Sequence, residues 1–206
     1  MSLEHWLAFV TASTALLLIP GPTVLLVLSY ALSKGRSVAL ACAAGVALGD
    51  LIAMSAALLG LGALVLASAT AFTLVKWAGA LYLIWHGVKL IRSAPTKGLA
   101  APRAVTTRGV FAHAAAVTAL NPKSIGFFIA FVPQFVDAQT PLLPQFAVLI
   151  ATFVGLAAIN ALAYALAADR LRRVVSRGSV IAWLTRVGGA TLIAMGILTT
   201  TLRRAT

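Results

Sequence analysis

Residues 5–32 read HWLAFVTASTALLLIPGPTVLLVLSYAL, and this stretch decides the fold class. It is apolar almost throughout and long enough to cross a bilayer, which takes about 20 helical residues. Pro20, Gly21 and Pro22 lie near its middle. Neither proline can donate a backbone hydrogen bond, and each ring clashes with the preceding helical turn. We therefore expect a membrane-spanning helix that is broken half-way, with backbone groups that need partners from protein or from a watery cavity.

The rest of the chain has the same apolar character. Five further apolar segments cover residues 38–66, 70–91, 109–136, 144–168 and 180–202. Of the 206 residues, 61% are hydrophobic and 10% are charged, whereas soluble domains carry about 25% charged residues. This composition excludes a soluble globular domain and a disordered chain, and the long unbroken apolar runs argue against a β-barrel. We predict an all-α integral membrane protein, a single membrane domain over residues 1–206 with six transmembrane helices.

The formal net charge of +12 indicates a membrane topology rather than a nucleic-acid partner. The basic residues gather in the first, third and fifth loops: Lys34 and Arg36, then Arg92, Lys97, Arg103 and Arg108, then Arg170, Arg172, Arg173 and Arg177. The second loop has no charge, and the fourth has only Asp137. Because basic loops stay on the cytoplasmic side, we expect both termini outside, although Arg203 and Arg204 argue mildly against this.

The two halves of the sequence share a weak pattern. Gly79, Leu83, Ile84 and Gly87 have the same spacing as Gly188, Leu192, Ile193 and Gly196. The first segment is interrupted at residues 20–22 and the fourth at 121–122. Chance recurrence of Gly and Leu is the alternative explanation. Two halves of three helices each insert in opposite orientations, so we predict two inverted three-helix repeats, 5–91 and 109–202, joined by a cytoplasmic basic loop over 92–108.

The second interruption is the sequence Asn121-Pro122-Lys123. Asn is a favoured helix N-cap and Pro a favoured first helical residue, so we expect a new half-helix to begin here, inside the membrane. The free N–H groups and partial positive charge of such a helix start suit a carboxylate. Lys123 opposes that helix dipole and is costly in a membrane, so it needs an anion nearby. Asp50 or a substrate carboxylate could supply it.

Asp50 is the only acid well inside any of the apolar segments. It follows Gly45 and Gly49, a pair of small residues that lets another helix approach closely. Ionisable residues within a membrane are typically functional, as ion partners or proton carriers. Asp50 therefore becomes the candidate for binding a substrate ammonium group or for carrying a coupled proton. A structural salt bridge is the alternative.

The remaining polar candidates are weaker. Tyr82 and Asn160 lie deep in their segments, where they could line a path or hydrogen-bond a neighbouring helix. His86 and His113 have no second His, Cys or acid at metal-binding spacing, so we expect no metal site. The chain has no Walker loop and no nucleophile elbow. We therefore expect no catalytic residue, no cofactor and no enzyme activity.

These features resemble the LysE/RhtB family of bacterial amino-acid exporters, over about residues 6–202. The stretches that match are Pro20-Gly21-Pro22, residues 45–50, Lys76-x-x-Gly79-Ala80-x-Tyr82-Leu83 with Gly87, Leu120-Asn121-Pro122-Lys123, Phe127-Phe128 and Pro133-Gln134-Phe135. The resemblance implies six helices in the bacterial cytoplasmic (inner) membrane and export of amino acids, driven by the proton motive force. Substrates of that family include lysine, arginine, threonine, homoserine and leucine. The single deep acid favours neutral over basic amino acids.

The sequence thus predicts a secondary transporter that exports a small zwitterion, with protons as the coupling ion. The substrate-binding residues are predicted to be Pro20, Gly21, Pro22, Asp50, Tyr82, Asn121, Pro122, Lys123 and Asn160. The broken helices near Gly21 and Asn121 would hold the carboxylate, and Asp50 the ammonium or the proton. An ion or metal exporter of the same superfamily, a passive channel, and a membrane subunit or enzyme remain alternatives. A homo-oligomer is left open.

Overall fold

The structure is a computed structural model that describes residues 1–67, 69–92, 106–137, 139–175 and 178–201. Within these ranges the regular elements are all helical, which confirms the all-α class. They are α1 (Leu3–Leu18), α2 (Pro22–Lys34), η1 (Gly35–Val38), α3 (Ala39–Ala67), α4 (Ala69–Arg92), α5 (Thr107–Ala119), α6 (Pro122–Ala130), η2 (Val132–Phe135), α7 (Leu142–Val175) and α8 (Gly178–Thr201). Most of the basic loop expected over 92–108 lies outside the described residues.

Both helix breaks predicted from the prolines are present. α1 ends at Leu18 and α2 begins at Pro22 after a bend of 55°. α5 ends at Ala119 and α6 begins at Pro122, and this second pair, extended through η2, is bent by 43°. In each pair proline is the first helical residue, where its missing N–H costs no helical hydrogen bond.

The helices have the length and hydropathy of membrane spans. Three stretches, Ala39–Ala63, Leu142–Ala168 and Gly178–Thr200, are long and apolar enough to cross a bilayer. Each bent pair also passes as one broken span, which brings the number to as many as five. α4 is not among them, and it contains Lys76, Lys89 and Arg92. The chain therefore has the character of an all-α membrane protein, and the count of six spans stays a prediction.

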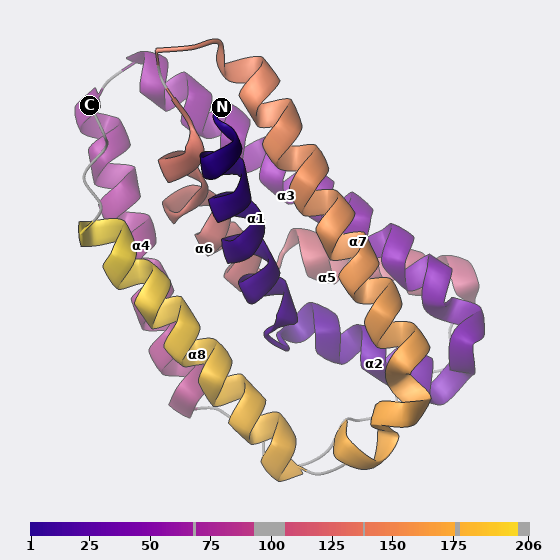
Figure 1. The fold of residues 1–206 in the computed structure, drawn as a ribbon. Coiled ribbons are helices and arrows are strands. Elements are labelled where there is room, and N and C mark those ends of the chain that lie inside the picture. Colours follow the sequence, from indigo (N-terminus) through magenta and orange to yellow (C-terminus); the bar gives the residue numbers. More distant parts are fainter. Residues whose placement is uncertain (68, 93–105, 138, 176–177, 202–206) are drawn as a thin grey trace.

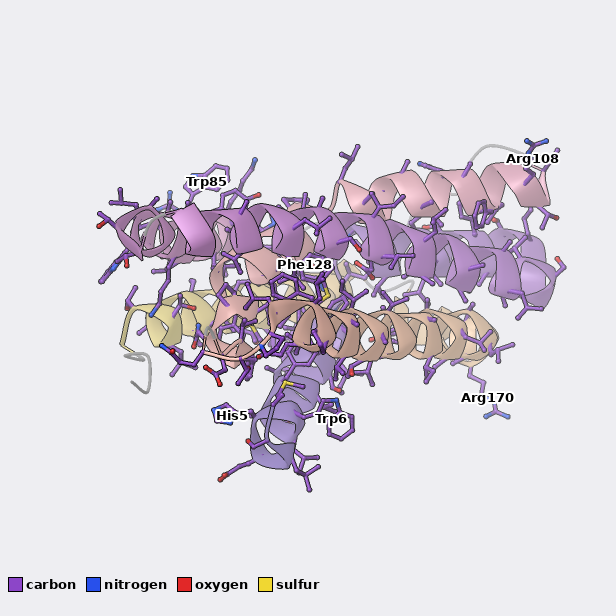
Figure 2. The ribbon with its side chains drawn as sticks, turned by 90° about the horizontal axis from the view of Figure 1, so that it is seen from above. His5, Trp6, Trp85, Arg108, Phe128 and Arg170 are labelled. Carbon is purple, nitrogen blue, oxygen red and sulfur yellow. The ribbon has the colours of Figure 1, made fainter. Side chains whose placement is uncertain are left out.

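The long helices form two pairs around a central element. α3 packs along α7, and α4 packs along α8, while α1 lies between the two pairs (Figure 1). The start of α1, with His5 and Trp6, projects away from the rest of the bundle (Figure 2). Arg108 at the start of α5 and Arg170 near the end of α7 lie toward one and the same end of the molecule.

Two glycines bring α3 and α5 into backbone contact, as their spacing predicts. A Cβ atom added to Gly49 would lie 2.6 Å from the carbonyl oxygen of Ala115 and 2.6 Å from the Cβ of Thr118. A Cβ on Gly45 would collide with the carbonyl oxygen of Phe111. No larger side chain fits at either position without moving a helix. This close packing fixes the turn of α3 that bears Asp50.

The packing of α4 against α8 is reciprocal. A Cβ on Gly87 would lie 2.5 Å from the carbonyl oxygen of Gly189 and 2.7 Å from Cγ1 of Ile193. A Cβ on Gly196 would lie 2.8 Å from the carbonyl oxygen of Ala80 and 2.7 Å from Cγ1 of Ile84. Gly87 and Gly196 are separated along the chain by the same number of residues as Gly79 and Gly188. The same holds for their contact residues, Ala80 with Gly189 and Ile84 with Ile193. The shared sequence pattern thus coincides with equivalent contacts on the two helices.

Candidate functional site

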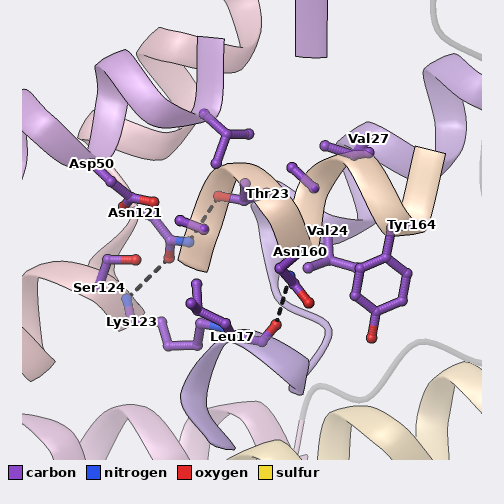
Figure 3. Close-up of a pocket in the computed structure, with 13 residues that line it drawn as sticks. Leu17, Thr23, Val24, Val27, Asp50, Asn121, Lys123, Ser124, Asn160 and Tyr164 are labelled. Carbon is purple, nitrogen blue, oxygen red and sulfur yellow. Dashed lines mark hydrogen bonds between the residues drawn. The ribbon is translucent and has the colours of Figure 1, made fainter. Parts of the chain in front are cut away.

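The two helix breaks meet at one pocket. In this structure the pocket is narrow, with a cavity volume of about 20 Å³, which is about the space of one water molecule. It lies where the end of α1 and the starts of α2 and α6 face α3 and α7 (Figure 3). Four of the predicted site residues line it: Asp50, Asn121, Lys123 and Asn160. They come from α3, α6 and α7, so three elements that are far apart in the sequence converge here.

Side chains of the second half of the chain bind the last carbonyl groups of α1. Lys123 donates from Nζ to the carbonyl oxygens of Leu16 and Ile19, both at 2.9 Å. The Asn160 amide donates to the Leu17 carbonyl at 3.1 Å. The Tyr164 hydroxyl donates to the Leu18 carbonyl at 3.0 Å. These are the carbonyls that a helix end leaves without intrahelical partners, so the broken helix is completed by α6 and α7.

The buried charge of Lys123 is stabilised by other groups than Asp50. Its side chain is buried, and among the described residues it forms no ion pair with Asp50 within 4 Å. Its ammonium group instead extends from the start of α6 to the carbonyl end of α1, which carries the negative end of a helix dipole. Gly21 lies beside it, and a Cβ there would make ordinary contact with Cε of Lys123 at 3.4 Å. Neutral carbonyl groups therefore bind the ammonium group in place of Asp50, and a substrate carboxylate as its partner stays a prediction.

The starts of α2 and α6 are joined by a short polar chain. Asn121 accepts a hydrogen bond at Oδ1 from the Lys123 amide, at 3.0 Å, and so caps α6 as predicted. Its Nδ2 donates to Oγ1 of Thr23 in α2, also at 3.0 Å, and Thr23 Oγ1 lies 3.3 Å from Oγ1 of Thr118. α2 begins at Gly21 and Pro22 without a side-chain cap. Two positive helix ends thus face the pocket, a geometry suited to an anionic group.

Asp50 is the acidic group of the pocket. Its side chain is 2% exposed, and its buried Oδ1 has no hydrogen-bond partner. A carboxylate removed from water without a partner is unfavourable, unless it is protonated or meets a cation. The close contact of Gly49 with α5 holds it in place. The site therefore offers an unsatisfied carboxyl group beside a lysine and two helix N-termini (Figure 3).

The other predicted residues have different positions. Pro20, Gly21, Pro22 and Pro122 form the breaks but do not line the pocket. Tyr82 does not line it either. Its ring stacks on His86 with centroids 5.9 Å apart, and it lies against α6 at Gly126. The role of Tyr82 in substrate binding therefore has no support from its place in the fold.

Three polar pocket residues escaped the sequence analysis: Thr23, Ser124 and Tyr164. Thr23 and Ser124 directly follow the two interrupting motifs, and Tyr164 lies one helical turn after Asn160. Their nearness in sequence to the predicted residues is the signal that could have identified them. Among the described residues no group of three or more His, Cys, Asp and Glu is placed to hold a metal ion.

Comparisons with known proteins point in one direction. The sequence model of the family described as LysE type translocator matches residues 14–202. The chain is 33% identical to the homoserine/homoserine lactone efflux protein of Salmonella typhimurium, over 100% of both chains. It is 33% identical to the leucine efflux protein of the same organism, over 68% of this chain and 66% of the relative. An uncharacterized membrane protein of Vibrio cholerae is 32% identical over 98% of both chains. No solved structure matches the chain.

Proposed function

Since the chain belongs to the LysE type translocator family, we propose that it is a secondary transporter that exports small neutral amino acids, driven by the proton motive force. Relatives named for amino-acid efflux support the class of substrate. The pocket between the two helix breaks is the proposed binding site. A binding site explains why these polar side chains lie together in one pocket, which neither a channel nor a structural subunit would require.

The observation that supports this function best is the arrangement of charge in the pocket. Asp50 presents an unpartnered carboxyl group, and the starts of α2 and α6 present positive helix ends beside Lys123. An amino-acid zwitterion has one group for each. Its carboxylate binds at the helix starts near Gly21 and Asn121, and its ammonium group binds Asp50. Broken helices at the midplane serve the same purpose in other secondary transporters.

Asp50 is also the proposed proton carrier. A single carboxyl group that binds either a proton or an ammonium group couples the two fluxes, because both cannot occupy it together. Exchange of one for the other on each cycle gives export driven by proton entry. Lys123 does not compete for Asp50, since its ammonium group is already satisfied by the carbonyls of α1.

The membrane arrangement we propose is six spans with both termini outside, in the bacterial inner membrane. Three observations support it: the two bent pairs that pass as broken spans, the matching contacts at Gly87 and Gly196, and the common end at which Arg108 and Arg170 lie. Residues 5–91 and 109–202 then form the two inverted repeats, and the loop over 92–108 faces the cytoplasm.

The test uses purified protein in proteoliposomes. Vesicles loaded with one radiolabelled amino acid at a time are given a pH gradient, and release is followed against vesicles without protein. We expect neutral amino acids to leave, and leave faster with the gradient. Release that equals the protein-free rate for every amino acid would contradict the transport function. Release that ignores the gradient and never proceeds uphill would indicate a passive channel.

A further inference from the structure

Part of the pocket wall is apolar. It consists of five small or medium aliphatic side chains: Val24 and Val27 of α2, Val46 of α3, one turn before Asp50, and Ala157 and Ala161 of α7. All five are buried, with exposed fractions between 1% and 6%. In Figure 3, Val24 and Val27 lie on the opposite side of the pocket from Asp50 and Ser124. The charged end of the pocket, at Asp50, thus lies across from Val24 and Val27, which have Asn160 and Tyr164 beside them.

α7 holds its part of this wall rigidly. Asn160 and Tyr164 bind the α1 carbonyls, so the helix cannot turn without breaking those hydrogen bonds. Ala157 and Ala161 are one turn apart and lie on the same face of α7. Each contributes only a methyl group, so a longer side chain at either position would occupy pocket space. A larger side chain at either alanine would therefore narrow the pocket further.

We propose that Val24, Val27, Val46, Ala157 and Ala161 form the subsite for the substrate side chain and determine which amino acids are exported. This inference rests on the proposed function, since it assumes that the zwitterionic groups bind at the charged end. The subsite accepts short uncharged side chains. It rejects lysine, arginine and glutamate, because a third charge would be buried against aliphatic carbon with no partner.

The experiment changes the subsite in both directions. Ala161→Val adds two methyl groups to the wall, and Val27→Ala removes two. Ala163→Val is the matched control, because Ala163 lies on the exposed face of the same helix. Each purified variant is reconstituted, and counterflow of labelled alanine, leucine and lysine is measured at equal protein content. Size-exclusion profiles report whether each variant is folded.

The ratio of leucine to alanine counterflow is the readout. A methylene in a hydrophobic pocket changes discrimination by about tenfold or more. We expect the ratio to fall about tenfold in Ala161→Val and to rise in Val27→Ala. We expect no change in Ala163→Val, and no lysine counterflow in the unmodified protein.

Two results would overturn the inference while leaving amino-acid transport intact. One is a leucine-to-alanine ratio that stays the same in both subsite variants. The other is lysine counterflow as fast as that of leucine in the unmodified protein. If the unmodified protein moves no amino acid at all, the proposed function fails, and the inference fails with it.

Discussion

Asp50 is the residue on which the transport cycle should depend most. Asp50→Asn keeps the size and hydrogen-bonding capacity of the side chain but removes its titrating charge. We expect uphill export to be lost. Because Asp50 also binds the ammonium group in the proposed mechanism, downhill counterflow should weaken too, with a higher half-saturation concentration. Counterflow that stays near the unmodified rate would show that Asp50 carries the proton alone.

The matched control for this change is Asp137→Asn, in an exposed position before α7. It removes the same charge without touching the pocket and should leave both modes unchanged. Uphill export at the full rate in Asp50→Asn would remove Asp50 from the mechanism.

Lys123 should contribute to stability through its hydrogen bonds to α1. Lys123→Met removes the Lys123 hydrogen bond to the Ile19 carbonyl and leaves the Leu16 carbonyl with the Ile19 amide alone, and an unpaired buried carbonyl costs about 1–3 kcal/mol. We expect a lower Tm in detergent as well as lost export. Because Asp50 is not its partner, combining Lys123→Met with Asp50→Asn should not restore activity. Recovery in the double variant would show that the two side chains act as an ion pair.

The break between α1 and α2 leads to a prediction for variants of Gly21. Its φ of −117° and ψ of −170° are extended backbone that other residues adopt, so the backbone conformation does not require glycine here, and only a side chain longer than a methyl group meets Lys123. Gly21→Ala brings a Cβ to ordinary contact, 3.4 Å from Lys123, and should retain export. Gly21→Leu should displace the Lys123 side chain and abolish export at normal abundance. Normal export by Gly21→Leu would reduce the break to a simple kink.

The contact between α3 and α5 should tolerate no side chain at Gly49. Gly49→Val overlaps Ala115 and Thr118, and overpacking of this kind costs about 1–3 kcal/mol. We expect a lowered Tm and reduced export. Gly60→Val is the control in the same helix, since nothing lies within 4 Å of a Cβ at Gly60. Equal melting temperatures for the two variants would contradict the close packing.

For the molecule as a whole, the proposed membrane topology can be tested by labelling single cysteines. In a Cys42→Ala background, single cysteines replace Ser33, near the first basic loop, and Thr140, in the loop before α7; both positions are exposed. In intact cells we expect a membrane-impermeant maleimide to label Thr140→Cys and to spare Ser33→Cys until the cells are permeabilised. The reverse pattern would invert the proposed topology.

Local chemistry made much of this protein predictable. Hydropathy decided that the chain is helical and membrane-like, because unbroken apolar runs leave no other way to satisfy the backbone. Proline positions located both breaks to within a residue or two, since a missing N–H and a ring clash act on the immediate turn. The Asn121 cap and the close approach at Gly45 and Gly49 followed from equally local rules.

The partners within the site depended on the tertiary structure. Lys123 binds carbonyls more than 100 positions earlier in the chain, and Asn160 and Tyr164 do the same. Tyr82 matched a motif, yet the packing of α4 places it against Gly126 of α6 and outside the pocket. A one-dimensional pattern identifies which residues are unusual for a membrane. Which of them meet is decided by how helices of similar hydropathy rotate and pack, because packing at close range, rather than hydrophobicity, selects one arrangement there.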